Sequence, residues 1–504
     1  MEHLDEIARE FLSRHPYDCS YTILGCSQKW TAGVLAAGAL WLLAYRWDLF
    51  VILFSFLSAA VYLSAALFKL VAACRGMVAT LGRRAPTEPL AEAALPSYTI
   101  LVPLFREAEV LPGLARHLET LDYPGDKLEV LLLLEEGDTE TLEAAGALDL
   151  SPAFRVIRVP RGAPQTKPRA CNYGLREARG DLVVIYDAED RPERDQLRKA
   201  VETFRRAPSD VICVQGRLAY HNAGRNWLTA CFAVEYATWF DFYLEGLQSM
   251  RVPLPLGGTS NHFKTEVLRE IGGWDPFNVT EDCDLGIRLY KRRYRTRTVD
   301  SVTWEEAAAE PGNWIRQRSR WVKGYFQTFF THMRHPLRTC RDLGPRGFAG
   351  FLLIVGGHSF LLVLNLVFWA LLALYLVWLG MDVVAGRSVW EVIAGDAEAV
   401  RTAWKMIYWG PSEHWLLAPL SVGFFVVSCA LLAANLVFVL LGLAAAFTRG
   451  RRGLLGAALT MPVYWVWISL GAWKGVLQLF TRPHYWEKTR HGLDAYEGSA
   501  EGRR

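Results

Sequence analysis

Acidic residues follow one apolar run of this chain at a spacing that suits metal binding. The run LVVIY precedes Asp187, Glu189 and Asp190, so we expect these carboxylates to emerge together where a strand ends. A hard divalent cation such as Mg²⁺ or Mn²⁺ binds carboxylate oxygens and holds a diphosphate at the same time. Because Arg191 and Pro192 come next, a solvated turn is the competing interpretation.

Two further groups of acids stand at element boundaries. Glu135 and Glu136 close the apolar run LLLL, and Thr280, Glu281 and Asp282 open the helix-like stretch DLGIRLYKRRY. An ionised carboxylate within hydrogen-bond reach of a hydroxyl can act as a general base. The structural alternative is that the first pair lies in a loop, while Thr280 caps a helix whose dipole the next two acids complement.

Basic and aromatic residues offer partners for phosphate and sugar. Lys167 and Arg169 suit a diphosphate, although a solvated loop explains them equally well. The segment RQRSRW at 316–321 places three guanidiniums beside an indole. Arginine forks bind phosphate, and an indole face stacks against a sugar ring. Anionic lipid would explain the arginines but not the glutamine or the tryptophan.

The glycine-containing segment GGTSNHFK at 257–264 could bring backbone close to a ligand. Gly258, Thr259 and Ser260 are therefore candidate acceptor contacts, with an ordinary turn as the alternative. The chain has neither a GxGxxG fingerprint nor a GxxxxGK[ST] loop. We expect His358, inside an apolar run, to pack between helices or at the lipid interface.

Short apolar runs that alternate with charged, helix-like stretches must position these residues. We expect strands at 97–103, 129–136, 154–160, 181–190 and 210–216, and helices at 107–121 and 192–207. This alternation predicts an α/β domain with a largely parallel sheet covered on both faces. Ligands then bind beyond the carboxyl ends of the strands, where the acids stand.

Longer apolar runs predict membrane helices. The runs 31–45 and 49–73 would form a hairpin through the bilayer, and 347–380 and 415–447 are each long enough to cross. The aromatic-rich run 453–480 is expected to lie on the membrane or re-enter it, which gives four spans, with five as the alternative.

Charge asymmetry orients these helices. Arg75, Arg83 and Arg84 precede the long polar stretch and place it in the cytoplasm. The connection 381–414 carries five acidic and three basic residues and is expected outside. The predicted divisions are an N-terminal segment 1–30, a hairpin 31–73, a linker 74–96, a catalytic domain 97–346, transmembrane helices within 347–447, an interfacial or re-entrant segment 448–480 and a cytoplasmic tail 481–504.

Composition supports a soluble domain joined to membrane helices. Of 504 residues, 52% are hydrophobic and 21% charged. The nine cysteines include no CxxC pair, which favours reduced thiols over a zinc site or a disulfide framework. The acidic start MEHLDEIARE argues against a removed signal peptide.

In order along the chain, these motifs resemble the membrane-bound glycosyltransferases of family 2, the group that contains cellulose, hyaluronan and chitin synthases. VPLFREAEV, with Pro103 and Glu107, resembles the family's first strand and turn, but Arg106 replaces an asparagine. LLLEEGDTE resembles the nucleotide-binding segment, with Glu135 and Glu136 in place of aspartates. DAED resembles the metal motif, TED at 280–282 matches as it stands, and QRSRW at 317–321 matches Q-x-x-R-W.

The resemblance implies a GT-A type domain and roles for individual residues. Asp282, assisted by Glu281, would be the general base. Asp187, with Glu189 or Asp190, would hold Mg²⁺ or Mn²⁺, and Trp321 would form the floor of the acceptor site. Trp486 would be a further acceptor contact. The donor contacts would be Pro103, Glu107, Glu135, Glu136, Lys167, Arg169, Asp187, Gln317, Arg320, Lys488 and Thr489, the last two in a gating segment that covers the nucleotide.

The resulting hypothesis is an inverting hexosyltransferase in the cytoplasmic membrane, with its catalytic domain in the cytoplasm. It would extend and export a polysaccharide from a UDP- or GDP-sugar, with a glycan or lipid-linked acceptor and no nucleic-acid partner. Single-sugar transfer to a lipid carrier and an inactive nucleotide-binding receptor or scaffold are the alternatives.

Overall fold

The structure is a computed structural model that describes residues 4–81, 91–392, 395, 398, 417–448 and 452–488. One eight-stranded sheet organises the domain that follows residue 91, in the order β3-β2-β1-β4-β7-β6-β8-β5. The strands are β1 (Tyr98–Leu104), β2 (Leu128–Glu135), β3 (Phe154–Val159), β4 (Leu182–Ile185), β5 (Arg191–Pro192), β6 (Val211–Tyr220), β7 (Asn261–Lys264) and β8 (Arg295–Glu305).

The sheet is mixed, with four parallel and three antiparallel pairings of neighbouring strands. Strands β3, β2, β1 and β4 run parallel, and so do β6 and β8. Strand β7 lies antiparallel between β4 and β6, and β5 pairs antiparallel with β8. The apolar runs predicted β1, β2, β3, β4 and β6. Strands β5, β7 and β8 were not predicted, and β7 and β8 mix polar with apolar residues.

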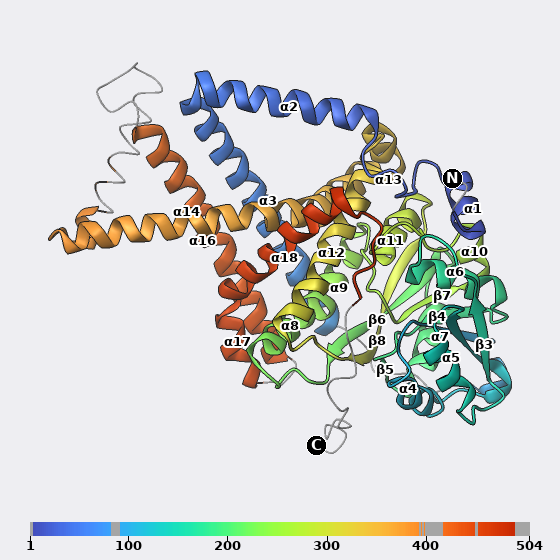
Figure 1. The fold of residues 1–504 in the computed structure, drawn as a ribbon. Helices are drawn as coiled ribbons and strands as arrows, with labels where there is room; N and C mark the ends of the chain where they lie inside the picture. The colour runs from blue at the N-terminus through green and yellow to red at the C-terminus, as the bar shows by residue number, and fades with distance from the viewer. Residues whose placement is uncertain are drawn as a thin grey trace.

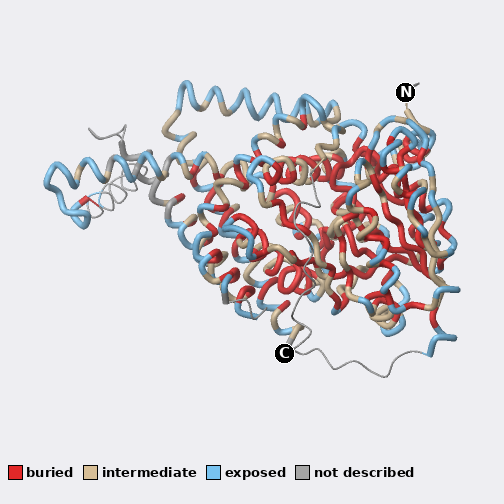
Figure 2. Tube along the Cα trace, turned by 60° about the horizontal axis from the view of Figure 1, so that its bottom comes forward, coloured by how far each residue is buried: buried red, intermediate tan, exposed pale blue. Residues whose placement is uncertain are grey.

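Both faces of the sheet are covered, as predicted. Alternate residues of β1 point to opposite sides: Ile100 joins one apolar cluster and Leu101 the other. Helices α4 (Leu111–Leu118), α5 (Thr139–Gly146) and α7 (Gln196–Arg206) cover one face. Helices α6 (Lys167–Glu177), α10 (Thr265–Glu270) and α11 (Glu281–Lys291) cover the other. Figure 2 shows the buried centre that results.

A second body of helices packs against the β6 and β8 side of the sheet domain (Figure 1). It contains α8 (Trp227–Ala237), the π-helix η3 (Thr238–Tyr243), α9 (Leu244–Met250), α12 (Pro311–His332), α17 (Leu455–Leu459) and α18 (Met461–Thr481). Helices α12 and α18 approach closely, since a Cβ on Gly475 would lie 2.6 Å from the carbonyl oxygen of Ser319. The short 3₁₀ turns are η1 (Glu92–Ala94), η2 (Gly125–Lys127) and η5 (Arg452–Leu454).

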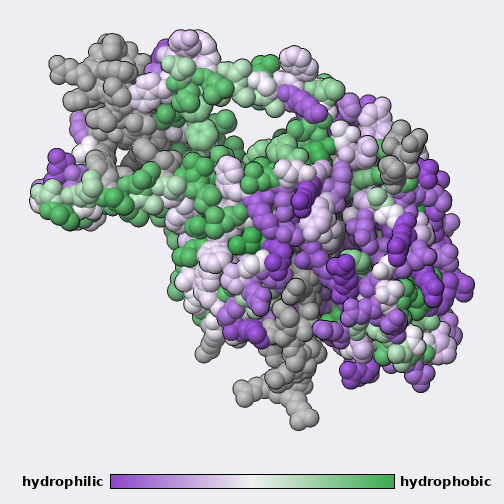
Figure 3. Space-filling model, in the orientation of Figure 1, coloured by the Kyte–Doolittle hydropathy of each residue, from purple (hydrophilic) through white to green (hydrophobic). Residues whose placement is uncertain are grey.

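Within the described residues, three helical segments are long and apolar enough to cross a membrane. They are Trp47–Thr80, inside α3 (Trp47–Leu81); Pro336–Val384, which joins α13 (Pro336–Phe351), the π-helix η4 (Leu352–Gly357) and α14 (His358–Val384); and Cys429–Thr448, inside α16 (Leu417–Thr448). Apolar surface gathers over this part of the molecule, whereas the sheet domain is hydrophilic (Figure 3).

The fourth predicted span belongs to α2 (Cys26–Tyr45), which is not among the three. Its first turns carry Ser27, Gln28 and Lys29, so the helix is less apolar than the run 31–45 taken alone. Helices α2 and α3 diverge from the turn at Arg46 instead of packing along one another, and no residue of α2 is buried (Figure 1). The predicted outer connection 381–414 lies largely outside the described residues.

The N-terminal segment is attached to the sheet domain. Helix α1 (Glu6–Arg14) packs near α6, where Asp5 forms an ion pair with Arg169 at 3.2 Å. Further along, the Ser20 amide donates to Asp275 at 2.6 Å. Residues 4–20 therefore form part of the domain rather than a separate tail.

Candidate active site

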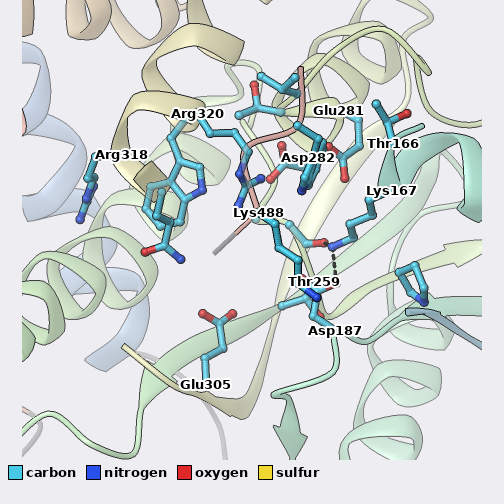
Figure 4. A pocket seen from close by; sticks show the side chains of 18 of the residues that line it. Thr166, Lys167, Asp187, Thr259, Glu281, Asp282, Glu305, Arg318, Arg320 and Lys488 are labelled. Carbon is cyan, nitrogen blue, oxygen red and sulfur yellow. Dashed lines mark hydrogen bonds and ion pairs between the residues drawn. The ribbon is translucent and has the colours of Figure 1, made fainter. Parts of the chain in front are cut away.

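A cavity of about 690 Å³ opens at the carboxyl ends of the strands. Its walls come from the strand ends, from α11 and α12, and from the segment 484–488 near the C-terminus. Most predicted site residues line it: Pro103, Glu107, Glu135, Lys167, Asp187, Glu189, Gly258, Thr259, Glu281, Asp282, Gln317, Arg320, Trp321, Trp486 and Lys488. Segments far apart in the sequence thus meet at one place (Figure 4).

Four predicted site residues do not line the cavity. Glu136 accepts from the Arg161 amide at the surface, and Ser260 is buried with its hydroxyl 2.6 Å from that of Thr303. Arg169 is fully buried between Asp5 and Glu135, at 3.2 and 2.9 Å.

Asp190 is the fourth, and it organises the loop beside the cavity. It accepts from the amide of Asp187 at 2.6 Å and from the hydroxyl of Thr259. Thr489 lies outside the described residues.

Lys167 and Asp187 form the centre of the cavity. Lys167 pairs with Asp187 and donates to the Gly258 carbonyl at 2.8 Å. Burial lowers the pKa of Lys167, but the charges of Asp187 and Glu281 outweigh it and raise this pKa. Lys167 therefore supplies a fixed positive charge at the end of β4. Within the described residues, Asp187 is the acid of the DAED loop with which it forms an ion pair.

Asp282 reaches the same point from α11. Its carboxylate accepts from the Cys283 amide at 2.8 Å, and a Cβ on Gly258 would lie 3.6 Å from one of its oxygens and 3.9 Å from Lys167 Nζ. Burial raises the pKa of Asp282 to about 6. Burial and the charge of Asp282 raise the pKa of Glu281 to about 8.

The structure also bears on the helix-cap alternative for this motif. Thr280 occupies the N-cap position of α11, but its side chain makes no cap hydrogen bond and lies 3.4 Å from Asn278 Oδ1. The next turn is anchored by Asp284, which accepts from Arg288 at 2.7 Å and lies 3.0 Å from His332 Nε2. Asp282 is thus held at the cavity without being needed to fasten the helix.

The carboxylates fit a cation that also binds the donor. Among the described residues, no three His, Cys, Asp or Glu side chains come together as a metal site. Mg²⁺ is often held by one or two carboxylates together with substrate phosphates and water. Asp187 and Glu189, both at the cavity, supply that number of carboxylates.

Helix α12 presents the Q-x-x-R-W residues. The Arg320 guanidinium lies 4.4 Å from the centre of the Trp486 ring. The Trp321 ring stacks on Tyr236 at 6.2 Å and 24°. Arg318, from the variable part of the motif, is buried and donates to Glu235 Oε1 at 2.8 Å and to the Tyr464 hydroxyl at 2.7 Å.

The segment 482–488, called here the closing segment, lies across the cavity. Lys488 binds the carbonyls of Phe105 and Arg106, the latter at 2.9 Å, and pairs with Glu107 at 3.1 Å. Glu487 accepts from Lys474 at 2.7 Å. These contacts tie the C-terminal part of the chain to the end of β1, more than 370 residues earlier.

Sequence reasoning missed several cavity residues. Glu235, Tyr236 and Glu305 line the cavity, although no motif marked them; the first two lie on α8 and the third ends β8. His358 of α14 packs against Tyr325 of α12, with ring centroids 5.8 Å apart, as expected for packing between helices, and it also lines the cavity. Burial and the nearby Asp190, Glu189 and Asp187 raise the pKa of Glu305.

Comparison with known proteins shows what part of this chain is similar to. Residues 96–324 match the family described as "Glycosyltransferase like family 2". A probable glycosyltransferase, YdaM, of Bacillus subtilis is 27% identical over 46% of this chain and 55% of its own length. The β-monoglucosyldiacylglycerol synthase of Synechocystis is 28% identical over 47% and 50%, and the poly-β-1,6-N-acetyl-D-glucosamine synthase of Staphylococcus aureus is 22% identical over 48% and 58%.

The chain spans about half the length of the curated relatives it matches. Among solved structures, the mannosyltransferase PcManGT of Pyrobaculum calidifontis, in complex with GDP-Man and Mn²⁺, is similar with a TM-score of 0.47 and 19% identity, over 85% of this chain and 99% of that one. The family matched by residues 96–324 is the one that the order of motifs predicted. Residues 96–324 of this chain therefore resemble the family 2 glycosyltransferases.

Proposed function

We propose that this protein transfers a hexose from a UDP- or GDP-sugar to a glycan acceptor in a single inverting displacement. The observation that carries the proposal is the meeting of Asp282, Lys167 and Asp187 in one cavity beneath the closing segment. Such a displacement needs a carboxylate that accepts the proton of the attacking hydroxyl. It also needs positive charge that stabilises the departing diphosphate, which the ion-paired lysine supplies.

The donor diphosphate would lie between Asp187, Lys167 and Arg320. A divalent cation held by Asp187 and Glu189 would neutralise charge on the departing diphosphate. Lys167 and Arg320 supply fixed positive charge at the same place without reorganising during the reaction. The closing segment, fastened through Lys488 to the end of β1, would exclude water from the donor.

Asp282 would take the proton from the attacking acceptor hydroxyl. A pKa raised to about 6 makes the carboxylate more basic than an exposed aspartate and still leaves it mostly ionised at neutral pH. The Trp321 ring would hold the acceptor sugar by stacking. A base on the acceptor side and a diphosphate leaving on the other side give inversion.

The cavity also reaches the apolar helices. Leu362 of α14 and Ile468 of α18 line it together with His358. This favours an acceptor that enters or leaves through the membrane side, as a growing polysaccharide would. The apolar character of Leu362 and Ile468 supports single-sugar transfer to a lipid as the second candidate, and a lipid glycosyltransferase stands among the relatives. The arginines that flank the domain favour a cytoplasmic active site.

A donor screen on the full-length protein in lipid nanodiscs tests the proposal. UDP- and GDP-hexoses are supplied with Mg²⁺ or Mn²⁺, and release of nucleoside diphosphate is measured. We expect release with one donor, and its loss in Asp282→Asn but not in the exposed-acid control Glu136→Gln. Sizing the product separates polymer from a lipid that carries one sugar. No release with any donor, or undiminished release in Asp282→Asn, would contradict the proposal.

A further inference from the structure

One carboxylate in the cavity has no role in the chemistry just described. Glu305 is the last residue of β8, and its backbone carbonyl accepts from the His221 amide at 3.1 Å. The side chain is half-buried and points into the cavity (Figure 4). No described side chain or backbone group forms a hydrogen bond or ion pair with this carboxylate.

Strand order places Glu305 on the acceptor side. Among the candidate nucleotide contacts, Glu107 follows β1 and Glu135 is the last residue of β2, while Asp187 follows β4. The order then continues through β7 and β6 to β8. Glu305 thus lies beyond Asp187 from the nucleotide side, where the acceptor must approach the transferred sugar.

The aromatic wall of the acceptor side is adjacent. Tyr236 stacks on Trp321, and burial and then the charge of Glu305 raise the pKa of Tyr236. Glu305 therefore stands beside the ring that backs Trp321. A sugar bound by stacking presents its hydroxyl groups around the ring edge, and a carboxylate beside an aromatic platform can accept from one of them.

The local charge limits what Glu305 can bind. Asp187 and Glu189 line the same cavity, so an anion with no cation between it and these acids would be repelled from Glu305. A sugar hydroxyl donates a hydrogen bond without adding negative charge. An unpaired, half-buried carboxylate near other acids costs stability unless a ligand satisfies it.

On this basis, and resting on the proposed function, we propose that Glu305 binds a hydroxyl group of the acceptor sugar and positions that sugar against Trp321. Glu305 is then a specificity residue for the acceptor and contributes nothing to donor binding. The proposal predicts different effects on the acceptor and on the donor, which bind in the same cavity, so measuring both substrates tests it.

The test compares Glu305→Ala and Glu305→Gln with the exposed-acid control Glu310→Gln. Donor affinity is measured from acceptor-free hydrolysis of the active donor found in the screen. Acceptor affinity is measured with a tetrasaccharide of the same sugar. We expect the acceptor KM of Glu305→Ala to rise by about 10- to 100-fold, because a hydrogen bond to a charged group is lost. Glu305→Gln keeps an acceptor oxygen and should lose less, while the donor KM stays unchanged in both.

Thermal unfolding in EDTA supplies a second readout. Removing an unpaired carboxylate from among acids should leave the midpoint of unfolding unchanged or raise it. A lowered midpoint would mark a structural role and overturn the inference, as would a donor KM that rises with the acceptor KM, or an unchanged acceptor KM. Equal losses in the Ala and Gln variants would indicate a cationic ligand and would also overturn it. Absence of turnover in the wild type would instead refute the proposed function itself.

Discussion

Replacing Asp282 by asparagine should stabilise the protein while it removes most of the activity. The pKa of Asp282 rises from 3.8 to about 6 in the folded protein. A raised acid pKa means that the folded state binds the proton more tightly than the unfolded state does. Ionised Asp282 therefore destabilises the fold above pH 6, and this effect disappears below the unfolded pKa. The rise in the pKa of Asp282 corresponds to at most about 3 kcal/mol, and screening by water in the cavity lowers the expected gain in stability to about 1–2 kcal/mol.

The same substitution removes the proposed base. General-base catalysis contributes about 10²–10⁴-fold, so diphosphate release in Asp282→Asn should fall by about that factor. Thermal unfolding of both proteins at pH 8 and pH 5 measures the stability gain, which should shrink as the pH falls. If asparagine instead lowers the unfolding midpoint, the carboxylate fastens α11, and the helix-dipole interpretation is correct. Full activity with a gain in stability would refute the base assignment alone.

Three other predictions concern the same site. Because Asp282 must be ionised to accept a proton, kcat/KM should fall about tenfold per pH unit below a midpoint near pH 6; a flat profile from pH 5 to 8 would contradict this. Lys488→Met should raise donor KM at least several-fold without changing the unfolding midpoint, since it removes the contact that holds the closing segment to β1; unchanged donor KM would argue against closure. Arg169→Met should lower the free energy of unfolding by about 3–5 kcal/mol, because it leaves the buried carboxylates of Asp5 and Glu135 unpaired. Chemical denaturation of the metal-free protein would measure this loss. Normal stability together with lost donor binding would show instead that Arg169 contacts the donor.

The class of fold could be predicted because the strands near the nucleotide side are buried on both faces. Such strands read as continuous apolar runs, as in β1 and β2. Strand β8 was not predicted, since RTRTVDSVTWE alternates charged with apolar residues and resembles a surface loop. Because β8 was not predicted, Glu305 could not be placed at the end of a strand. The direction of its side chain toward the acceptor side of the cavity could therefore not be inferred.

Arg169 and Asp190 show what residue type alone does not determine. Both side chains could bind a donor phosphate or a metal ion, yet each is already bound to other residues of the protein. Motif spacing in the sequence does not reveal these partners. Arg169 is paired with Asp5, which lies 164 residues earlier in the chain. Asp190 turns back to the Asp187 amide and Thr259. Most residues of the ordered motifs line one cavity, but which acid or base faces it depends on contacts from distant segments.

The attachment of the N-terminal segment to the sheet domain limits how many times the chain can cross the membrane. Ser20 lies against Asp275, and the same domain begins again after α3, so the chain between them must cross the bilayer an even number of times. If α3 crosses, then α2 must cross as well, despite its polar first turns. His484 lies 2.9 Å from the Phe277 carbonyl oxygen, so it is on the same side of the membrane as the sheet domain. The number of crossings between α12 and residue 484 must therefore also be even. If α14 and α16 both cross, α18 must then stay on the side of the active site.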